Sequence, residues 1–236
     1  MQLDEVDSTN DEARRHALSG GQVPIWIAAK RQVKGRGRQG RPWAEADGNL
    51  YATLLIHPDM PTGKASLLSF AACLAVAELF EACGGAATLK WPNDALLNGG
   101  KAAGVLLEGS GQGASLDWLA IGIGVNLTHA PSDVPGAIHP PTSIFGATGQ
   151  MVSADDALTR IAASLHRSIS VLREDGFGPI RDAWISRAAR MGERITARLP
   201  GEDITGIFED VDAEGALVLR TTTGQRHIHA ADIYFP

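Results

Sequence analysis

The residues best suited to chemistry lie between positions 30 and 41, which read Lys-Arg-Gln-Val-Lys-Gly-Arg-Gly-Arg-Gln-Gly-Arg. They bring six positive charges, three glycines and no acid into a chain whose formal net charge is -6. Glycine lets a backbone approach a ligand closely, and arginine presents forked donors that suit phosphate or carboxylate. The pattern indicates a mobile loop that closes over an anionic ligand. A solvated loop and a nucleic-acid patch are the alternatives.

Other polar residues stand at the ends of apolar strands. Asn93 and Asp94 follow Pro92, which lacks a backbone donor and ends a strand. A Pro-Asn-Asp turn with no further role is the competing interpretation. Lys101 opens the apolar run 102–107 and can reach inward as a fixed positive charge, although a lysine at a strand end is more often solvated.

Gly122 and Gly124 alternate within an apolar strand that ends at Asn126. Glycines weaken a strand, so their presence indicates that something lies against its backbone. The sequence contains no Walker loop, metal-ligand spacing of His and Cys, or nucleophile elbow. We expect the scattered histidines to be structural or solvated; they are His57, His129 and His139.

The composition is that of a globular protein, with 236 residues, 44% of them hydrophobic and 20% charged. The acidic net charge argues against general affinity for DNA or for membranes. No apolar run reaches the ~18 residues of a membrane span, and the acidic N-terminus is no signal peptide.

Cys73 and Cys83 stand ten positions apart in one apolar stretch. If that stretch is a helix, they are too far apart for a disulfide. Two buried thiols fit a reducing cytoplasm.

Alternating strands and helices must position these residues. A strand at 3–7 precedes a helix for which Thr9 is the expected N-cap, with Glu12 completing a capping box. A strand at 25–30 leads into the basic loop. Further strands are expected at 49–57, 87–91, 95–97, 102–108 and 118–127, and helices at 64–83, 153–174 and 180–190, with residues 128–152 as a loop. From residue 192, four short β runs at 195–199, 203–210, 216–221 and 225–229 predict a small barrel. We therefore expect one domain at 1–190 and another at 191–236.

Taken together in this order, the motifs resemble the biotin protein ligase family, the biotin–acetyl-CoA-carboxylase ligases. The resemblance covers residues 3–190 and extends into the barrel at Asp210-Val211-Asp212 and Gly215-Ala216-Leu217. It rests on Ser8-Thr9-Asn10, Gln32 to Trp43, Lys90-Trp91-Pro92-Asn93-Asp94, Lys101 to Glu108, and Gly122 to Asn126. It implies an α+β fold: a mixed β-sheet with flanking helices, like class II aminoacyl-tRNA synthetases, plus a C-terminal SH3-like β barrel.

The resemblance also implies a two-step reaction with ATP and Mg²⁺ as co-substrates. The carboxylate of biotin attacks the α-phosphate of ATP, which gives biotinyl-5′-AMP and pyrophosphate. The adenylate then acylates one lysine of a biotin carboxyl carrier domain of acetyl-CoA carboxylase or a related carboxylase. No tightly bound prosthetic group is implied, the expected location is the cytoplasm, and a homodimer is left open.

The implied site residues fall into three groups. Lys101, Arg36 and Arg38 are the expected catalytic residues. Biotin is expected to contact Ser8, Thr9, Asn10, Gln32, Gly35, Arg36, Gly37, Arg38, Lys101, Gly104 and Gly122. The nucleotide is expected to contact Arg38, Arg41, Trp43, Asn93, Asp94 and Asn126, of which Asp94 and Asn126 also offer oxygens to Mg²⁺. These roles agree with the physics, because cations must cancel the repulsion between a carboxylate and a triphosphate.

Two rivals stay open. A lipoate or octanoyl ligase-like protein would share the fold, but the arginine-glycine loop and the C-terminal barrel favour biotin. A nucleic-acid-binding module would use the basic run. The acidic net charge and the lack of stacking aromatic residues nearby argue against it.

Some family members carry an N-terminal helix-turn-helix and act as repressors. Here the catalytic pattern starts within ten residues of Met1, so we expect a ligase without specific DNA binding.

Overall fold

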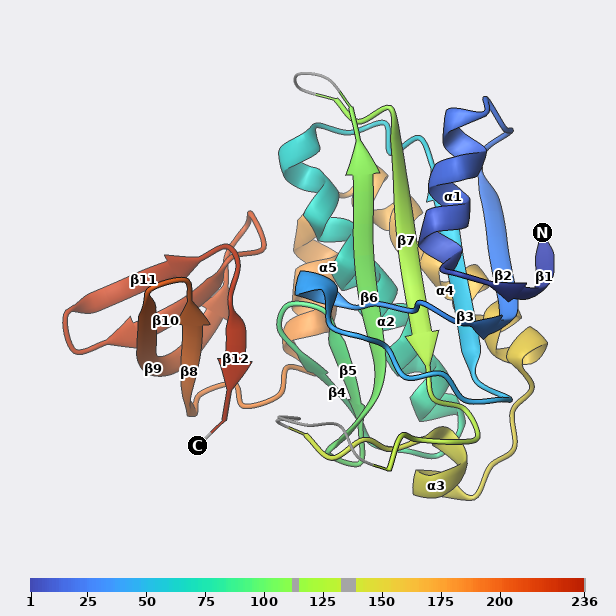
Figure 1. The fold of residues 1–236 in the computed structure, drawn as a ribbon. Helices are drawn as coiled ribbons and strands as arrows, with labels where there is room; N and C mark the ends of the chain where they lie inside the picture. Colours follow the sequence, from blue (N-terminus) through green and yellow to red (C-terminus); the bar gives the residue numbers. More distant parts are fainter. Residues whose placement is uncertain (112–114, 133–138, 236) are drawn as a thin grey trace.

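The structure, a computed structural model, describes residues 1–111, 115–132 and 139–235 and contains two β-sheets (Figure 1). The strands of the larger sheet are β1 (Gln2–Val6), β2 (Ile25–Gln32), β3 (Leu50–Ile56), β4 (Ala87–Lys90), β5 (Asp94–Leu97), β6 (Gly100–Ser110) and β7 (Trp118–Val125). Their order is β1-β2-β3-β7-β6-β5-β4. Strands β1 and β2 pair in parallel, and the other neighbours pair antiparallel. The predicted mixed sheet is confirmed.

The smaller sheet follows the last helix in the chain. Its strands are β8 (Arg194–Leu199), β9 (Glu202–Val211), β10 (Leu217–Thr221), β11 (Gly224–Ile228) and β12 (Asp232–Tyr234), in the order β11-β10-β9-β8-β12. All its pairings are antiparallel. The sheet fits the expected small SH3-like barrel, although it has one strand, β12, that the sequence did not predict.

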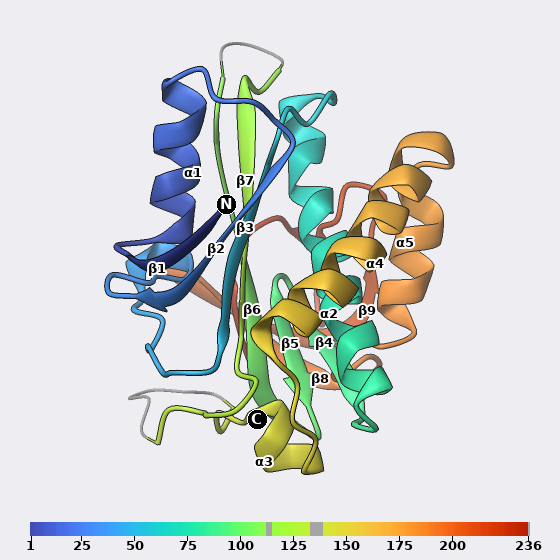
Figure 2. The same ribbon diagram turned by 90° about the vertical axis from the view of Figure 1, so that its right-hand side faces the viewer.

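Helices cover both faces of the larger sheet (Figure 2). Helix α1 (Thr9–Leu18) packs on one face, and helices α2 (Leu68–Ala82), α4 (Ala154–Glu174) and α5 (Phe177–Ile185) lie on the other. Strand alternation serves both layers: in β7, Ile121 and Ile123 join the core beneath α2, while Gly122 and Gly124 point to the α1 face. On the α1 face, the backbone of β7 therefore carries no side chains at these two positions.

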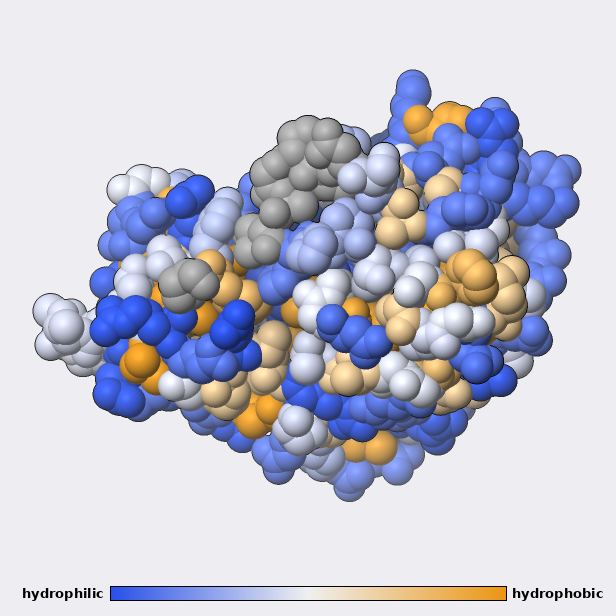
Figure 3. Space-filling model, turned by 90° about the horizontal axis from the view of Figure 1, so that it is seen from below, coloured by the Kyte–Doolittle hydropathy of each residue, from blue (hydrophilic) through white to orange (hydrophobic). Residues whose placement is uncertain are grey.

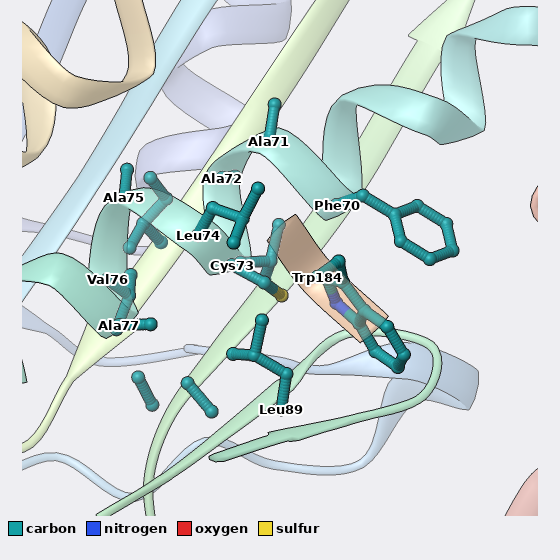
Figure 4. Close-up of a cluster of buried hydrophobic side chains, with 14 of the residues drawn as sticks. Phe70, Ala71, Ala72, Cys73, Leu74, Ala75, Val76, Ala77, Leu89 and Trp184 are labelled. Atoms are coloured by element: carbon teal, nitrogen blue, oxygen red, sulfur yellow. The ribbon is translucent and has the colours of Figure 1, made fainter. Parts of the chain in front are cut away.

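Helix α2 is the centre of the main core. Most of its residues are buried, and small residues such as Ala71, Ala72 and Cys73 let neighbouring elements pack closely around it (Figure 4). The Phe70 ring meets the Trp184 ring of α5 edge-on, with centroids 5.2 Å apart. The stretch Thr62–Ala82 is long and apolar enough to cross a membrane, but 78% of its hydrophobic window is buried inside the protein. It is therefore a core helix by its packing.

The core continues into the smaller sheet. The turn at Gly215 lies against α2 and the residue before it, because a Cβ there would stand 3.0 Å from Leu67 and 3.1 Å from Phe70. Trp91 Nε1 donates a hydrogen bond to the Gly215 carbonyl over 3.0 Å. The two sheets thus meet through packed side chains as well as through the chain connection.

Three local expectations need correction. The N-cap of α1 is Ser8, and neither Ser8 nor Thr9 caps the helix through its side chain, since the Thr9 hydroxyl donates to Gln32 instead. The stretch 128–152 contains helix α3 (Ile144–Thr148), capped by Ser143; residues 133–138 of that stretch lie outside the described residues. The predicted helix at 64–83 is divided into the 3-10 helix η2 (Thr62–Leu67) and α2. By contrast, Ser153 caps α4 as expected, and both cysteines are buried and free.

Candidate functional site

A cavity of about 360 Å³ opens on the α1 face of the larger sheet and extends to the smaller one. Every residue that the sequence placed in the site lines this cavity except Gly35. The lining residues among them are Ser8, Thr9, Asn10, Gln32, Arg36, Gly37, Arg38, Arg41, Trp43, Asn93, Asp94, Lys101, Gly104, Gly122 and Asn126. Gly35 lies just behind, where a Cβ would stand 2.6 Å from Gln32 Nε2.

The end of the cavity at α1 and β2 is a buried polar network. Thr9 donates to Gln32 Oε1 from its backbone nitrogen over 2.8 Å and from its hydroxyl over 3.0 Å. Thr53 Oγ1 lies 2.8 Å from Thr9 Oγ1 and 2.7 Å from Asn10 Oδ1. All four side chains are buried. Such networks hold polar groups in fixed directions, as recognition of a polar ring requires.

Arg36 connects the start of the basic loop to two elements of the site. Its guanidinium contacts Asp11 Oδ2 at 2.5 Å on α1 and Glu108 Oε2 at 3.0 Å on β6. These bonds raise the pKa of Arg36, and the bond from Arg36 lowers the pKa of Asp11. Glu108 also accepts from Asn10 Nδ2 over 2.7 Å. The structure therefore gives Arg36 two carboxylate partners within the protein, while the residue also lines the cavity.

The alternating glycines of β7 have two different neighbours. A Cβ at Gly122 would stand 2.3 Å from Asn10 Oδ1, and one at Gly124 would stand 2.8 Å from Trp43 Cε2. Gly104, which pairs with Gly124 across the strands, also faces the indole: a Cβ at Gly104 would stand 3.1 Å from Trp43 Cζ3. Trp43 thus lies on a glycine floor. Its Nε1 is buried and has no hydrogen-bond partner among the described residues.

The middle of the cavity carries one close ion pair. Lys101 Nζ lies 2.7 Å from Asp94 Oδ1, which joins β6 to β5, and 5.7 Å from the centre of the Trp43 ring. Asn93 Nδ2 donates to the Val105 carbonyl over 2.5 Å, and Asn126 Nδ2 donates to the Thr142 carbonyl over 2.9 Å. These hydrogen bonds to backbone oxygens fix the orientation of both side-chain amides, including their oxygen atoms. The Lys101 ammonium, beside the Asp94 carboxylate and the fixed amides, can therefore position the anion of a ligand.

The far end of the cavity includes residues that the sequence did not predict. Ala231, Asp232 and Ile233 line it from the smaller sheet. Arg38 donates to the Ala231 carbonyl over 3.3 Å, and Arg41 pairs with Asp232. These contacts bring the basic loop against β12. No local signal in the sequence could have indicated them, because they join positions almost 200 residues apart.

Two more lining residues were present in the sequence analysis without a role in the site. His139 was expected to be structural or solvated, but it lines the cavity, and burial lowers its pKa. Its ring meets Phe235 edge-on at 4.8 Å, and its Nε2 is buried without a partner among the described residues. Lys90 also lines the cavity and is 7% exposed.

Comparison with known proteins identifies this arrangement. The model of the biotin/lipoate A/B protein ligase family matches residues 3–126, and the model of the biotin protein ligase C-terminal domain matches residues 191–235. The chain belongs to the biotin/lipoate A/B protein ligase family. It is 47% identical to the biotin–[acetyl-CoA-carboxylase] ligase of Paracoccus denitrificans, over 99% of both chains. It is 32% identical to the bifunctional ligase/repressor BirA of Bacillus subtilis, over 98% of this chain and 72% of that one.

Members of the biotin/lipoate ligase family with solved structures share the architecture. The biotin protein ligase of Aquifex aeolicus in complex with biotin and ATP superimposes with a TM-score of 0.84 at 28% identity, over 99% of this chain and 96% of that one. The enzyme of Leishmania major in complex with biotinyl-5-AMP gives a TM-score of 0.68 at 26% identity, over 97% and 98% of the two chains. Both sheets of this family member are included in these alignments.

Proposed function

We propose that this protein is an ATP-dependent ligase that joins biotin to a lysine of a biotin carboxyl carrier domain. The observation that carries the proposal is the full-length relationship to a biotin–[acetyl-CoA-carboxylase] ligase, combined with one cavity that gathers the expected site residues. The carrier is that of acetyl-CoA carboxylase or a related carboxylase. We propose residues 1–190 as the biotin- and ATP-binding domain and residues 191–236 as the C-terminal domain, with the cytoplasm as the location.

The polar network at Thr9, Asn10 and Gln32 is the proposed site of the biotin ring. From there the strand order leads to Lys101 on β6, where the biotin carboxylate and the α-phosphate of ATP meet. The carboxylate oxygen bonds to the α-phosphorus, the bond between that phosphorus and the bridging oxygen breaks, and pyrophosphate leaves. Lys101 and Arg38 lower the repulsion between the two anions as they approach.

The residues present fit a magnesium ion that arrives with ATP. Among the described residues, no group of three His, Cys, Asp or Glu side chains could hold a metal alone. A Mg²⁺ bound to phosphates needs only one or two protein oxygens, since it keeps several waters. Asp94 and Asn126 both line the cavity and offer such oxygens. The ion would supply charge neutralisation of the triphosphate.

Transfer to the carrier needs no covalent enzyme intermediate. The amine of the carrier lysine attacks the carbonyl carbon of biotinyl-AMP, the bond to the phosphate oxygen breaks, and AMP leaves as the amine loses a proton. The basic loop is the proposed cover that keeps water from this reactive anhydride. It starts at β2, crosses the cavity with Trp43 and touches β12 through Arg41, which suits that role.

The nucleic-acid alternative is weakened by the contacts of the same loop. Lys30 pairs with Asp4, Arg31 with Glu45, and Arg41 with Asp232, so much of the basic charge is matched within the protein. Because these cations are already paired within the protein, they would gain little by displacing counterions from a phosphate backbone. On the face seen from below, hydrophobic residues form small groups among hydrophilic ones (Figure 3).

The deciding experiment is incubation of the protein with ATP, Mg²⁺ and biotin, followed by mass spectrometry for biotinyl-AMP. A purified carrier domain is then added, and its mass is expected to rise by one biotin. Lipoate and octanoate in place of biotin are the matched controls. Adenylation of either of these, with none of biotin, would replace the proposal by the lipoate-type alternative.

A further inference from the structure

Glu108, on β6, bonds to two residues that line the cavity. It accepts a hydrogen bond from Asn10 Nδ2 over 2.7 Å, and Arg36 Nη2 lies 3.0 Å from each of its two oxygens. The Glu108 side chain is half-buried. Arg36 has a second anchor in Asp11, which accepts two further bonds from the guanidinium. Glu108 therefore joins the polar network on α1 to the start of the basic loop.

The contacts of the Asn10 amide leave it one orientation. Its nitrogen faces β6, 2.7 Å from Glu108 Oε2 and 3.4 Å from the Leu106 carbonyl. An ionised carboxylate and a carbonyl accept hydrogen bonds and donate none, so the end of the amide that faces them must be its NH₂ group. The amide oxygen then points the other way, towards Thr53 and Gly122. The opposite orientation would set this oxygen against a carboxylate.

The Asn10 oxygen is an acceptor on the floor of the cavity. A Cβ at Gly122 would stand 2.3 Å from it, so the oxygen occupies the space that a side chain would take there. Asn10 and Gly122 both line the cavity. A carbonyl oxygen has two lone pairs, and the Thr53 hydroxyl, 2.7 Å away, occupies one of them. The other lone pair suits an N–H group of a ligand.

The ring of biotin carries N–H donors, whereas the dithiolane ring of lipoate and the alkyl chain of octanoate carry none. We propose that Glu108 is a positioning residue for biotin specificity: it holds the Asn10 amide so that its oxygen accepts from a ring N–H of biotin. This inference rests on the proposed ligase function. A site built to bond a donor disfavours ligands that lack it, because the buried acceptor would stay unpaired.

Replacement of Glu108 by its amide tests this role. In Glu108→Gln the side chain can donate as well as accept, so the Asn10 amide can take either orientation. KM for biotin is expected to rise about tenfold, as for the loss of one hydrogen bond. KM for ATP and kcat are expected to stay at their wild-type values, since the lost interaction is one of substrate binding and Asp11 still holds Arg36.

Glu78→Gln, on α2, is the matched control. Glu78 accepts from Ser164 over 2.6 Å and from Arg167 over 2.9 Å, so it also contacts one neutral donor and one arginine. It lies on the opposite side of the sheet from α1 (Figure 2), and this variant is expected to keep the wild-type KM for biotin. Thermal unfolding separates stability from recognition. A Glu108→Gln protein that melts at a lower temperature but keeps its KM for biotin would overturn the proposal.

An exchange of the two side-chain types is the sharper test. In the double variant Asn10→Asp/Glu108→Gln, the amide at position 108 donates to the carboxylate at position 10, which again offers the cavity an acceptor. KM for biotin is expected to return to within about threefold of the wild-type value, whereas Asn10→Asp alone sets two carboxylates against each other and raises KM at least about tenfold. A double variant as impaired as either single variant would contradict the assignment, even where a single variant does not fold.

Failure of the proposed function would give a different result. A wild-type protein that adenylates lipoate or octanoate and not biotin refutes the ligase proposal itself. A wild-type protein that adenylates biotin, with a Glu108→Gln variant that has the same KM for biotin, refutes only the role of Glu108.

Discussion

Gly122 is the position where one methyl group should disturb the site most directly. In Gly122→Ala, the new Cβ would stand 2.3 Å from Asn10 Oδ1 and 2.9 Å from its Cγ. Strand β7 is paired on both sides, with β3 and β6, and cannot retreat easily. The Asn10 side chain must therefore rotate. It then loses its contact with Thr53 at 2.7 Å and its bond to Glu108 at 2.7 Å.

The size of the effect follows from these two bonds. A neutral hydrogen bond contributes about 1 kcal/mol and one to a charged group about 1.5–3 kcal/mol, so Gly122→Ala should cost about 2.5–4 kcal/mol of unfolding free energy. At about 2–4 °C per kcal/mol for a chain of this size, the melting temperature should fall by roughly 5–16 °C. With biotin bound at this network, loss of one bond of about 1.4 kcal/mol raises KM for biotin about tenfold.

The assays are thermal unfolding and biotin-dependent release of pyrophosphate. Gly178→Ala is the matched control, because no heavy atom lies within 4 Å of the Cβ it would add and its backbone dihedral is ordinary for a helix. That control should gain about 0.4–1 kcal/mol. A Gly122→Ala protein that melts with the wild type and keeps its KM for biotin would refute the reasoning.

Three further outcomes are expected. Lys101→Ala should keep its fold and release pyrophosphate about 10²–10³-fold more slowly, since the cation at the reacting groups is gone; near wild-type turnover would contradict its assignment. Trypsin should cut the 30–41 segment much more slowly when biotinyl-AMP is bound, and equal cutting would argue against loop closure. Hydrogen bonds from Arg15 lower the pKa of Asp7 to about 2. Its stabilising effect is therefore present above the ordinary value of 3.8 and is lost as pH falls towards 2, so the melting temperature of Asp7→Asn should fall less over that range than that of the wild type.

The sequence predicted those parts of the site that come from continuous motifs. Ser8 to Asn10, the basic loop and the Lys90–Asp94 segment each lie on one short stretch, and their order along the chain specified the family. The two glycines of β7 were correctly expected to have something against their backbone. Their separate neighbours, Asn10 and Trp43, depend on how α1 and the loop fold over the sheet.

The remaining features depend on long-range packing. Asp232 and Ala231 reach the cavity only because the smaller sheet docks beside β4, and three residues of strand carry no periodicity that could predict it. Thr9 has the residue type of an N-cap, but the buried amide of Gln32 competes for its hydroxyl. The pairing of Arg36 with Asp11 also depends on this packing, because helix α1 brings the carboxylate next to the loop. The contact of Arg36 with the ligand stays a prediction.

The joint between the two sheets has a thermodynamic consequence. The Gly215 turn packs on Leu67 and Phe70, and buried residues of both sheets belong to one continuous hydrophobic cluster. Separation at residue 190 would leave that cluster exposed on each side, which a chain avoids by unfolding as one cooperative unit. We therefore expect a single calorimetric transition, with no step in which the C-terminal sheet melts first. Damage to the small sheet would then also lower the stability of the polar network at Thr9, Asn10 and Gln32.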